Sequence, residues 1–531
     1  MFFNKKKKIE EFRNQWGKPV ERFRNMGLIA IYHQLMTSMI KSEYVDDKTW
    51  NDLNFDSFFD LVDRNISAVG QQYLYHKLHT FEKDENKLKK FSVLCEKFKR
   101  NQSLRESIRP AMMNLNDVSS YFIPNIILSK SLPFTKYYRL FYLGSILPYI
   151  AIILTFQYPF FFFITFLLFV INYVLNKVFA KPIQEYFAGF KGVNDLIVSA
   201  KKLANIKETG ELQELKYIYQ RKNILNKLGK KIGKLVVDKE AVNDVLLVGI
   251  EYLNILFLFD LIAYYKSVDT LQKFQKEMAT IYEIIGMLDS AISIASYLEE
   301  NNKYCTPIFT KEKRIEFENM YHPLITDAVS NSLLDLSKSA LVTGSNMSGK
   351  TTFIKTIGIN TILSQTLYFC HASRFVVPNY KVKSSIDRKE DLEHKKSYFF
   401  VEVEELKKFT ELSENGNSYI FLVDEIFRGT NTVERLAAST AVLKYLNNHS
   451  IIFVTTHDVE LQDLLQNEFE MLHFSEKVEN GQYYFDYKIH KGPCRTRNAI
   501  KLLEIKNYPK SIIQEANSIA IKLTETKNEI L

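Results

Sequence analysis

Cysteine is scarce and scattered in this chain. Its 531 residues include only four, Cys95, Cys305, Cys370 and Cys494, and their spacing does not resemble that of metal ligands. This pattern predicts reduced thiols in a cytosolic compartment. No cleaved signal peptide is expected, because no apolar segment follows the N-terminal lysines Lys5 to Lys8. Low-complexity tracts and internal repeats are also absent from the sequence.

Charged side chains are missing from one long stretch. Leu140 to Asn176 are 37 consecutive residues without Asp, Glu, Lys or Arg, and Pro159 divides them into halves of roughly 18 residues. At about 1.5 Å per residue, each half reaches roughly 27 Å, barely the thickness of a bilayer core. A buried hairpin in a soluble core is the alternative, but soluble helices keep a polar face, which the run around Phe160 to Phe163 lacks. We therefore expect a transmembrane or deeply inserted helical hairpin.

Basic residues flank both ends of this stretch. Lys136 and Arg139 precede it, and Lys177 and Lys181 follow it. Because basic flanks stay on the cytoplasmic side of a membrane, both ends of the hairpin are expected there and its tip on the far side. The sequence therefore predicts a protein of the cytoplasmic membrane whose soluble domains face the cytoplasm.

Glycine is also sparse, with 18 residues, yet two glycines belong to the sharpest motif. The pattern G-x-x-x-x-G-K-[ST] is filled by Gly344, Gly349, Lys350 and Thr351, after an apolar segment with strand character and before a predicted helix. The backbone N–H groups of such a loop, together with the helix N-terminus, bind phosphate. Lys350 would reach the β- and γ-phosphates, and the Thr351 hydroxyl would bind Mg²⁺.

Two further motifs follow in the order expected of a nucleotide hydrolase. The apolar segment from Ile420 to Val423 predicts a buried strand that ends in Asp424 and Glu425. Such a pair suits a site where Asp424 holds Mg²⁺ through water and Glu425 polarises the attacking water. A second apolar strand, from Ile451, ends in polar residues that include His457, which would sense or stabilise the γ-phosphate.

These motifs together resemble the ATPase domain of the DNA mismatch-repair MutS family, an ABC-type ATPase. The resemblance rests on GSNMSGKTTFIKTIG, DEIFRGTNT and TTHDVEL, and on the segments Tyr321–Leu324, Ser397–Glu402 and His490–Gly492. The helical segment Tyr508–Leu523 resembles the C-terminal helix-turn-helix through which these ATPases pair. Upstream, Phe58–Leu78 and Ile284–Pro307 resemble the start of the family's core domain and the end of its lever helices.

The resemblance implies a set of site residues. Glu425, His457 and Lys350 would be catalytic, and Thr351 and Asp424 would bind the metal. Tyr487 is the candidate for stacking on the adenine base, with Val329 to Asn331 completing the base pocket, and Ser397 would reach the nucleotide of the partner subunit. The nucleotide-binding residues are then Gly344, Ser345, Asn346, Met347, Ser348, Gly349, Lys350, Thr351, Thr352, Tyr487 and, in trans, Ser397.

The sequence also departs from the family pattern. The 54 residues before the matching region are expected to be too few for the mismatch-reading or connector domain, and the nuclease-like Smr domain of some relatives is not expected after residue 523. Phe427 stands where the family usually has glycine, and Lys395 and Lys396 replace the usual Gly-Arg pair before Ser397. These changes leave nucleotide binding secure and bear on the contact with the partner subunit.

Two segments of the expected lever region leave alternatives open. Lys216 to Val237 is basic and free of acidic residues, in a chain whose formal net charge is +9. It is interpreted as a solvated face, a contact for DNA phosphates or a contact for anionic lipid. The apolar run from Tyr252 to Tyr265 carries Asp260, and its length predicts a buried lever helix rather than a membrane span.

The predicted architecture has three parts. Residues 1–54 form a basic N-terminal segment, and residues 55–304 an all-α MutS-like core and lever domain with a transmembrane hairpin at residues 140–176. Residues 305–531 form an α/β ABC-type P-loop ATPase domain with a C-terminal dimerisation element. The predicted function is a membrane-anchored MutS-like ATPase that uses ATP and Mg²⁺ as a homodimer, contacts lipid and binds duplex DNA without reading mismatches. The alternative is a membrane-associated assembly or remodelling ATPase that has lost DNA binding and acts on an unidentified cytosolic protein.

Overall fold

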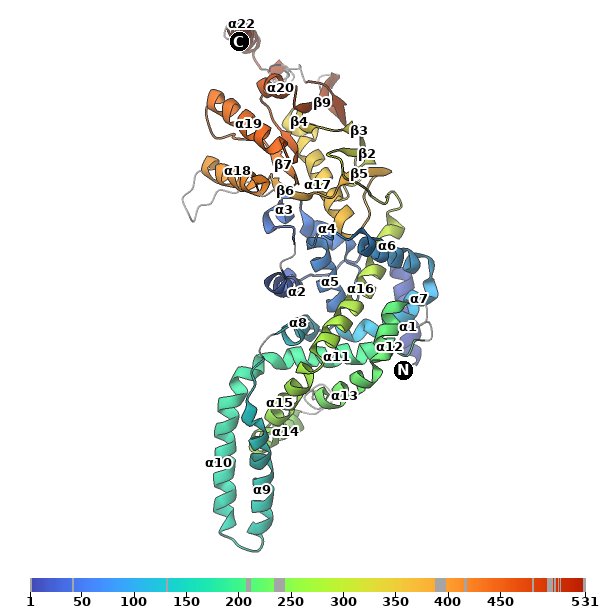
Figure 1. Ribbon diagram of the computed structural model, residues 1–531, viewed down its shortest axis with the longest axis vertical. Helices are drawn as coiled ribbons and strands as arrows, with labels where there is room; N and C mark the ends of the chain where they lie inside the picture. Colours follow the sequence, from blue (N-terminus) through green and yellow to red (C-terminus); the bar gives the residue numbers. More distant parts are fainter. Residues whose placement is uncertain are drawn as a thin grey trace. The chain divides into compact units, whose positions relative to one another are not determined.

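The computed structural model divides the chain into two compact units (Figure 1). The helical unit comprises Met1–Glu43, Phe59–Thr80 and Glu85–Asn302, and the sheet unit comprises Tyr44–Phe58, Phe81–Asp84 and Lys303–Leu531. The expected order of a helical N-terminal region and a C-terminal α/β domain is confirmed. The structure describes residues 2–40, 43–129, 132–206, 212–233, 244–386, 398–414, 418–479, 482–493, 500, 503–504, 506 and 508–528.

The helical unit is organised around a long buried helix, α16. Asp289 on α16 accepts hydrogen bonds from the backbone N–H (2.9 Å) and the hydroxyl (2.5 Å) of Ser67, the N-cap of α5, so the two helices are joined where α5 begins. The helices of this unit are α1 (Phe2–Gln15), α2 (Met26–Met39), α5 (Ala68–His79), α6 (Glu85–Arg100), α7 (Gln102–Met112), α8 (Ile123–Ile127), α9 (Phe141–Thr155), α10 (Phe161–Ala180), α11 (Phe187–Leu203), α12 (Gln213–Gln220), α13 (Lys222–Ile232), α14 (Asp244–Phe257), α15 (Phe259–Gln272) and α16 (Gln275–Glu300), with the 3₁₀ turns η1 (Met113–Asn116), η2 (Val118–Phe122), η3 (Lys136–Leu140) and η4 (Lys181–Tyr186).

The charge-free stretch forms a helical hairpin, with α9 and α10 side by side (Figure 1). A turn over residues 156–160 joins them and contains Pro159, where a missing N–H costs little. Among the described residues, three helical segments are long and apolar enough to cross a membrane: Lys136–Thr155, Phe161–Leu203 and Gln275–Glu300. The third is 78% buried over its most apolar window, as befits a core helix, whereas the first two are 22% and 11% buried.

The polarity of the hairpin is inverted relative to that of a soluble helical pair. Its buried positions include Ser145, Pro148 and Ala151 on α9 and Thr165 and Asn172 on α10. Its exposed positions are large and apolar, and they follow helical spacing along the outer faces of both helices: Leu143, Ile146, Leu147, Ile150 and Ile153 on α9, and Phe162, Phe163, Phe166, Leu167, Val170, Ile171 and Val174 on α10.

Asn172 connects the hairpin to α14. Its side-chain amide donates to the carbonyl of Gly144 on α9 (2.7 Å) and to that of Leu256 on α14 (2.6 Å), and its side chain is buried. The ring of Phe257 stacks on Tyr149 with centroids 4.2 Å apart. The apolar run that predicted one lever helix is divided here, because Leu258 takes a left-handed φ of 57° and separates α14 from α15.

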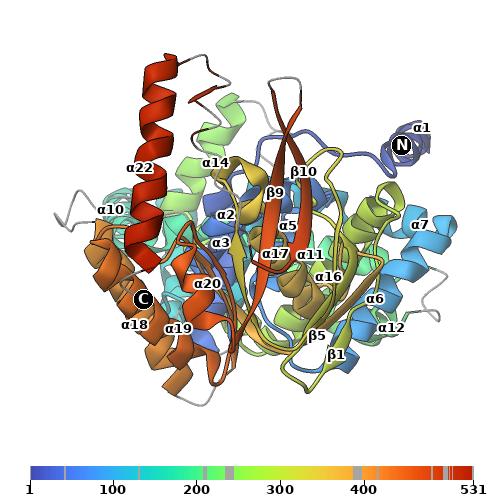
Figure 2. The ribbon, with the colours of Figure 1, turned by 90° about the horizontal axis from the view of Figure 1, so that it is seen from above.

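The sheet unit contains a six-stranded sheet in the order β10-β9-β4-β8-β7-β6, parallel except for β10, and a four-stranded sheet in the order β1-β5-β2-β3. Figure 2 shows β9 and β10 as a long two-stranded arm. The elements of this unit are α3 (Asp47–Asp52), β1 (Ile308–Thr310), β2 (Ile315–Met320), β3 (Asn331–Leu336), β4 (Ser339–Thr343), η7 (Asn346–Ser348), α17 (Lys350–Thr366), β5 (Arg374–Pro378), β6 (Lys381–Ser385), α18 (Tyr398–Glu414), β7 (Tyr419–Asp424), α19 (Thr432–Asn447), β8 (Ile451–Thr455), α20 (Glu460–Leu465), β9 (Phe469–Glu479), β10 (Gln482–Lys491) and α22 (Lys510–Asn528); α4 (Phe55–Val62) runs from this unit into the helical unit.

The central strands of the larger sheet are buried on both faces, as parallel strands between helices should be. On one face, Phe421 and Val423 of β7 belong to the apolar cluster that includes residues of α18, α19 and α20. On the other face, Leu422 packs against α17 so closely that a Cβ added to Gly358 would lie 2.5 Å from its Cδ1 atom. This packing fixes the direction in which α17 leaves the phosphate-loop motif.

Residues 44–58 belong to the sheet unit, although the sequence suggested a domain boundary at residue 55. Asp46, the N-cap of α3, forms an ion pair with Lys383 of β6 (2.5 Å). Asp52 at the other end of α3 accepts from the Ser384 hydroxyl (2.7 Å) and the Ile386 N–H (2.9 Å). The short helix α3 therefore packs against β6, the edge strand of the six-stranded sheet.

Candidate functional site

The phosphate-loop motif forms the expected turn between β4 and α17. Gly344 and Gly349 take φ values of 135° and 100°, which side-chain-bearing residues rarely adopt. At Gly344 a Cβ would also lie 2.9 Å from the carbonyl oxygen of Phe474. The Lys350 ammonium donates to the carbonyls of Gly344 (2.7 Å) and Ser345 (3.0 Å). These contacts hold the ammonium at the loop, where a phosphate group would bind.

The acidic pair lies where β7 ends, beside the start of α17. The Thr351 hydroxyl donates to the two carboxylate oxygens of Asp424 at 3.2 and 3.0 Å. Thr455, at the end of β8, also donates its hydroxyl to Asp424. The structure thus brings together the two residues predicted to bind Mg²⁺, with hard oxygen atoms of the kind this ion prefers.

Glu425 is held by partners on both carboxylate oxygens. Its Oε1 atom lies 3.0 Å from Nε2 of His457, and its Oε2 atom lies 2.8 Å from Nη1 of Arg428. The hydrogen bond from His457 and the nearby positive charges of Arg428 and Lys350 lower the pKa of Glu425 below its ordinary value. The carboxyl group is therefore ionised at neutral pH.

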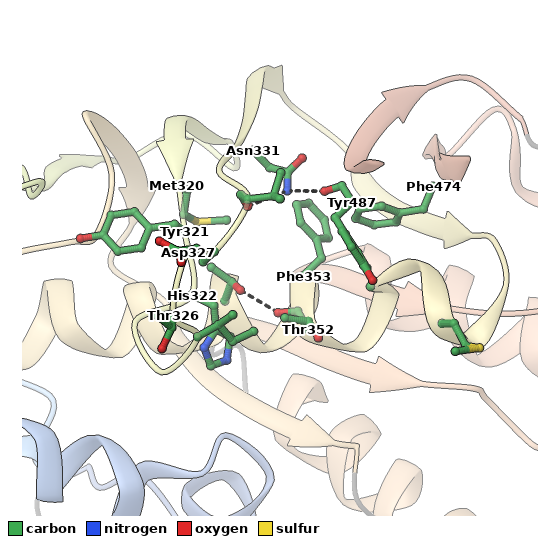
Figure 3. Close-up of a pocket in the computed structure, with 16 residues that line it drawn as sticks. Met320, Tyr321, His322, Thr326, Asp327, Asn331, Thr352, Phe353, Phe474 and Tyr487 are labelled. Atoms are coloured by element: carbon green, nitrogen blue, oxygen red, sulfur yellow. Dashed lines mark hydrogen bonds between the residues drawn. The ribbon is translucent and has the colours of Figure 1, made fainter. Parts of the chain in front are cut away.

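Beside the loop lies a cavity of about 490 Å³. Figure 3 shows the rings of Phe353, Phe474 and Tyr487 on one side of it and the Tyr321 and His322 side chains on the other. Burial, with a smaller effect of the charge of Lys355, lowers the pKa of His322 to about 4, so this imidazole is neutral. The lining also includes the carboxyl side chain of Asp327. A cavity lined mainly by aromatic rings with a few polar groups suits a flat heteroaromatic base.

Asn331 fixes the position of Tyr487. Its side-chain amide donates to the Tyr487 carbonyl (3.0 Å), and its side-chain oxygen accepts the N–H of Ile489 (2.8 Å). Tyr487 itself takes a φ of 52° at an irregularity in the pairing of β10 with β9. The tyrosine ring, 45% exposed, is thereby presented at the cavity beside Gly349.

Most of the residues predicted for the site lie together in the sheet unit. Residues 344–352 form the loop and the start of α17, Asp424, Glu425 and His457 lie at adjacent strand ends, and Val329, Asn331 and Tyr487 line the cavity. Ser397, Lys395 and Lys396 lie outside the described residues. The sequence did not single out Arg428, Thr455, Phe353 or Phe474, although Arg428 stands within the DEIFRGTNT motif itself.

The loop and the acidic pair fit a nucleotide phosphate with its metal ion. Within the described part of the chain, the Ser345 hydroxyl is buried without a hydrogen-bond partner, and it belongs to the loop whose N–H groups would face an anion. Such an orphaned group is stabilised when a polar ligand binds. Thr351 and Asp424 would hold Mg²⁺, and Lys350 would hold the phosphate oxygens.

Comparisons with known proteins agree on one family. Residues 340–524 match the model of MutS domain V. The DNA mismatch repair protein MutS of Geobacillus sp. (strain WCH70) is 28% identical over 323 residues, covering 58% of this chain and 36% of that protein. The MutS protein of Lactobacillus acidophilus is 30% identical over 279 residues, and that of Listeria monocytogenes serotype 4b is 28% identical over 280 residues; each match covers 50% of this chain and 31% of the relative. The matched part of the chain thus spans about a third of the length of these relatives.

Proposed function

Because the chain is a MutS-family protein with a MutS domain V over residues 340–524, we propose that it binds and hydrolyses ATP as a homodimer. One observation carries the proposal: the convergence of Lys350, Thr351, Asp424, Glu425 and His457 at adjacent strand ends beside the phosphate loop. MutS proteins are ATPases as a family, and the residues present here are those that such chemistry needs.

The residues divide the work of hydrolysis between them. Lys350 and the loop N–H groups would hold the β- and γ-phosphates, and Thr351 and Asp424 would hold Mg²⁺, which would supply positive charge against the phosphate oxygens. Glu425 orients and polarises the attacking water. His457 and Arg428 each engage one carboxylate oxygen of Glu425 and orient the group, and the remaining lone pairs of those oxygens can accept a hydrogen bond from the attacking water.

The Tyr487 ring is proposed to stack on the adenine base. We expect Tyr487→Ala to raise the Kd for ATP about tenfold, because stacking of a base on an aromatic ring contributes about 1–3 kcal/mol. Tyr484→Ala is the matched control, since Tyr484 lies on the same strand, is 59% exposed and is not among the residues lining the cavity. Titration of a fluorescent ATP analogue measures both variants, and equal affinity in wild type and Tyr487→Ala would remove the residue from the site.

We further propose that the hairpin formed by α9 and α10 anchors this ATPase in the cytoplasmic membrane, with its soluble parts in the cytoplasm. The inverted polarity supports this proposal. Large apolar side chains such as Ile153 (68% exposed), Phe156 (91%) and Phe163 (68%) face outward, whereas most of the buried positions carry small or polar side chains: Ser145, Ala151, Thr165 and Asn172. Small residues at the contact and apolar residues outside are typical of helices that pack within lipid.

Duplex DNA is the proposed partner of the helical unit, and α13 is the candidate contact. Three lysines of α13 contact neighbouring parts of the same unit. Lys222 donates to Asn205 (2.9 Å), Lys231 donates to Thr270 (3.0 Å), and Lys227 lies over the ring of Phe274. Contacts between lysine side chains and phosphates carry no sequence information. The contribution of α13 to DNA binding should therefore be electrostatic.

We expect homoduplex DNA and DNA with a single mismatch to bind with equal affinity, and binding to weaken steeply as salt increases. Fluorescence anisotropy of the detergent-solubilised protein, with and without ATP, tests this expectation. A reproducible preference for the mismatch would contradict it. No DNA binding at any salt concentration would favour the second candidate, an assembly or remodelling ATPase acting on a cytosolic protein, which the exposed apolar hairpin also supports.

A further inference from the structure

The loop after Asp424 holds two non-glycine residues in the left-handed region. Glu425 has a φ of 54° and Phe427 a φ of 55°. Residues other than glycine keep this conformation only where the surrounding structure imposes it. The MutS resemblance places glycine at the position of Phe427, so this chain has a large side chain where the backbone favours none. Something must hold the loop in place.

One end of the loop is fixed by β8. The N–H of Glu425 lies 3.1 Å from the carbonyl oxygen of Thr455 and 3.2 Å from its hydroxyl oxygen. The Thr455 hydroxyl also donates to Asp424, as described above. These contacts set the start of the loop but leave Phe427 and the residues after it to be held from elsewhere.

The other end of the loop is fixed by the first turns of α18. The N–H of Phe427 donates to the Glu402 carboxyl group, which is fully buried. The rings of Phe399 and Phe427 lie with centroids 6.0 Å apart. A Cβ added to Gly429 would lie 2.8 Å from the Cβ of Phe399, so the helix approaches the loop as closely as a glycine permits. Phe399, Glu402, Phe427 and Gly429 are called the Glu402 cluster below.

The Phe427 side chain offsets the strain of its backbone. Its ring is 5% exposed and belongs to the apolar cluster beneath α18 and α19. A glycine at this position would relax the backbone but would leave the loop without the contact to Phe399. The Phe427 ring therefore attaches the loop to α18.

We propose that the Glu402 cluster positions Glu425 for hydrolysis by fixing the 425–429 loop to α18. The proposal rests on the proposed ATPase activity and adds a positioning residue, Glu402, which does not touch the nucleotide. Glu402 acts through the backbone N–H of Phe427, which lies two residues along the loop from Glu425.

The test compares Glu402→Ala, Glu402→Gln and Glu411→Gln in the full-length, detergent-solubilised protein. We expect Glu402→Ala to lower kcat about tenfold or more, because a buried hydrogen bond to a carboxyl group is lost, with KM and the Kd for a fluorescent ATP analogue unchanged. Glu402→Gln should retain most of the activity, since its amide oxygen still accepts the Phe427 N–H. Glu411 is the matched control, an exposed carboxylate on the same helix whose partner is Lys407.

A double substitution separates positioning from simple support of the fold. Phe427→Gly should lower kcat by itself, and the Glu402→Ala/Phe427→Gly protein should be slower by less than the product of the two single effects, because both changes loosen the same attachment of the 425–429 loop to α18. Equal kcat in wild type and Glu402→Ala overturns the inference. So does a joint loss of melting temperature, nucleotide affinity and kcat that Glu402→Gln does not rescue. Absence of turnover in the wild type would instead overturn the proposed ATPase function, and the inference with it.

Discussion

Lys350→Ala should abolish nucleotide binding, whereas Glu425→Ala should bind ATP and fail to hydrolyse it. The Lys350 ammonium is the buried cation of the phosphate loop, placed within 3.0 Å of the Gly344 and Ser345 carbonyls. Its removal leaves the phosphate charge without its main counter-charge. Glu425 stands outside the loop, at the end of β7, so its loss affects the attacking water and not the bound phosphates.

The expected effects on the two variants are large and different in kind. Removal of a general base slows a reaction by about 10²–10⁴-fold, so Glu425→Ala should trap a stable ATP complex. Equilibrium binding of a fluorescent ATP analogue and steady-state phosphate release measure the two properties separately. Lys338→Ala is a control for loss of a lysine, because Lys338 is exposed and donates to the Asn467 carbonyl (2.8 Å), away from the phosphate loop. Unchanged turnover in both site variants would refute the assignment.

Single cysteines at Gln157 and Lys181 should react differently with an impermeant thiol reagent added from outside the cell. Gln157 lies in the turn that joins α9 to α10, and Lys181 lies where α10 passes into η4, so the length of α10 separates them. At about 1.5 Å per residue, the 20 residues of α10 reach roughly 30 Å, the thickness of a bilayer core. Only the cysteine at position 157 should be labelled.

The labelling needs a background without the four native cysteines. Cys95 and Cys370 are buried and Cys305 is partly buried, so their replacement by alanine or serine should be checked by melting temperature first. Labelling of Lys181→Cys from outside would reverse the proposed topology. Protection of both positions in intact cells, with labelling of both after lysis, would indicate a hairpin that enters the membrane without crossing it.

Local patterns in the sequence were sufficient to predict much of the fold. The apolar segments before the glycine loop, before Asp424 and before His457 became β4, β7 and β8, because a run of buried apolar residues ending in polar ones is a local signature of a central parallel strand. The hairpin followed from the same kind of evidence. Length and an absence of charge were enough to predict two helices with a turn at Pro159.

The features that the sequence did not predict depend on contacts between distant residues. The sequence analysis did not single out Asp46 or Asp52, and their bonds to Lys383, Ser384 and Ile386 place α3 beside β6. Asn172 is a single polar residue in an apolar run, and its two carbonyl partners lie 28 and 84 positions away.

In the candidate site, too, local motifs could be predicted from the sequence, whereas contacts between distant residues could not. Motif spacing was enough to predict the glycine loop and the placement of Thr351, Asp424 and Glu425 beside it, since each lies within a few residues of a recognisable strand end. The bond from Asn331 to the Tyr487 carbonyl, which presents the tyrosine ring, joins residues 156 positions apart. The departure at Phe427 was visible in the sequence, but its left-handed backbone and its contact with Glu402 required the fold.

The central claim is that one chain carries both an ATPase and its membrane anchor. Flotation of the full-length protein with liposomes, followed by an assay of Mg²⁺-dependent ATP hydrolysis in each fraction, tests this claim most directly. The account predicts that the activity floats with the lipid, and that a variant in which a short polar linker replaces Leu140 to Asn176 keeps its activity at the bottom of the gradient. Wild-type activity that remains at the bottom with the soluble proteins, or floated protein that hydrolyses no ATP, would contradict it.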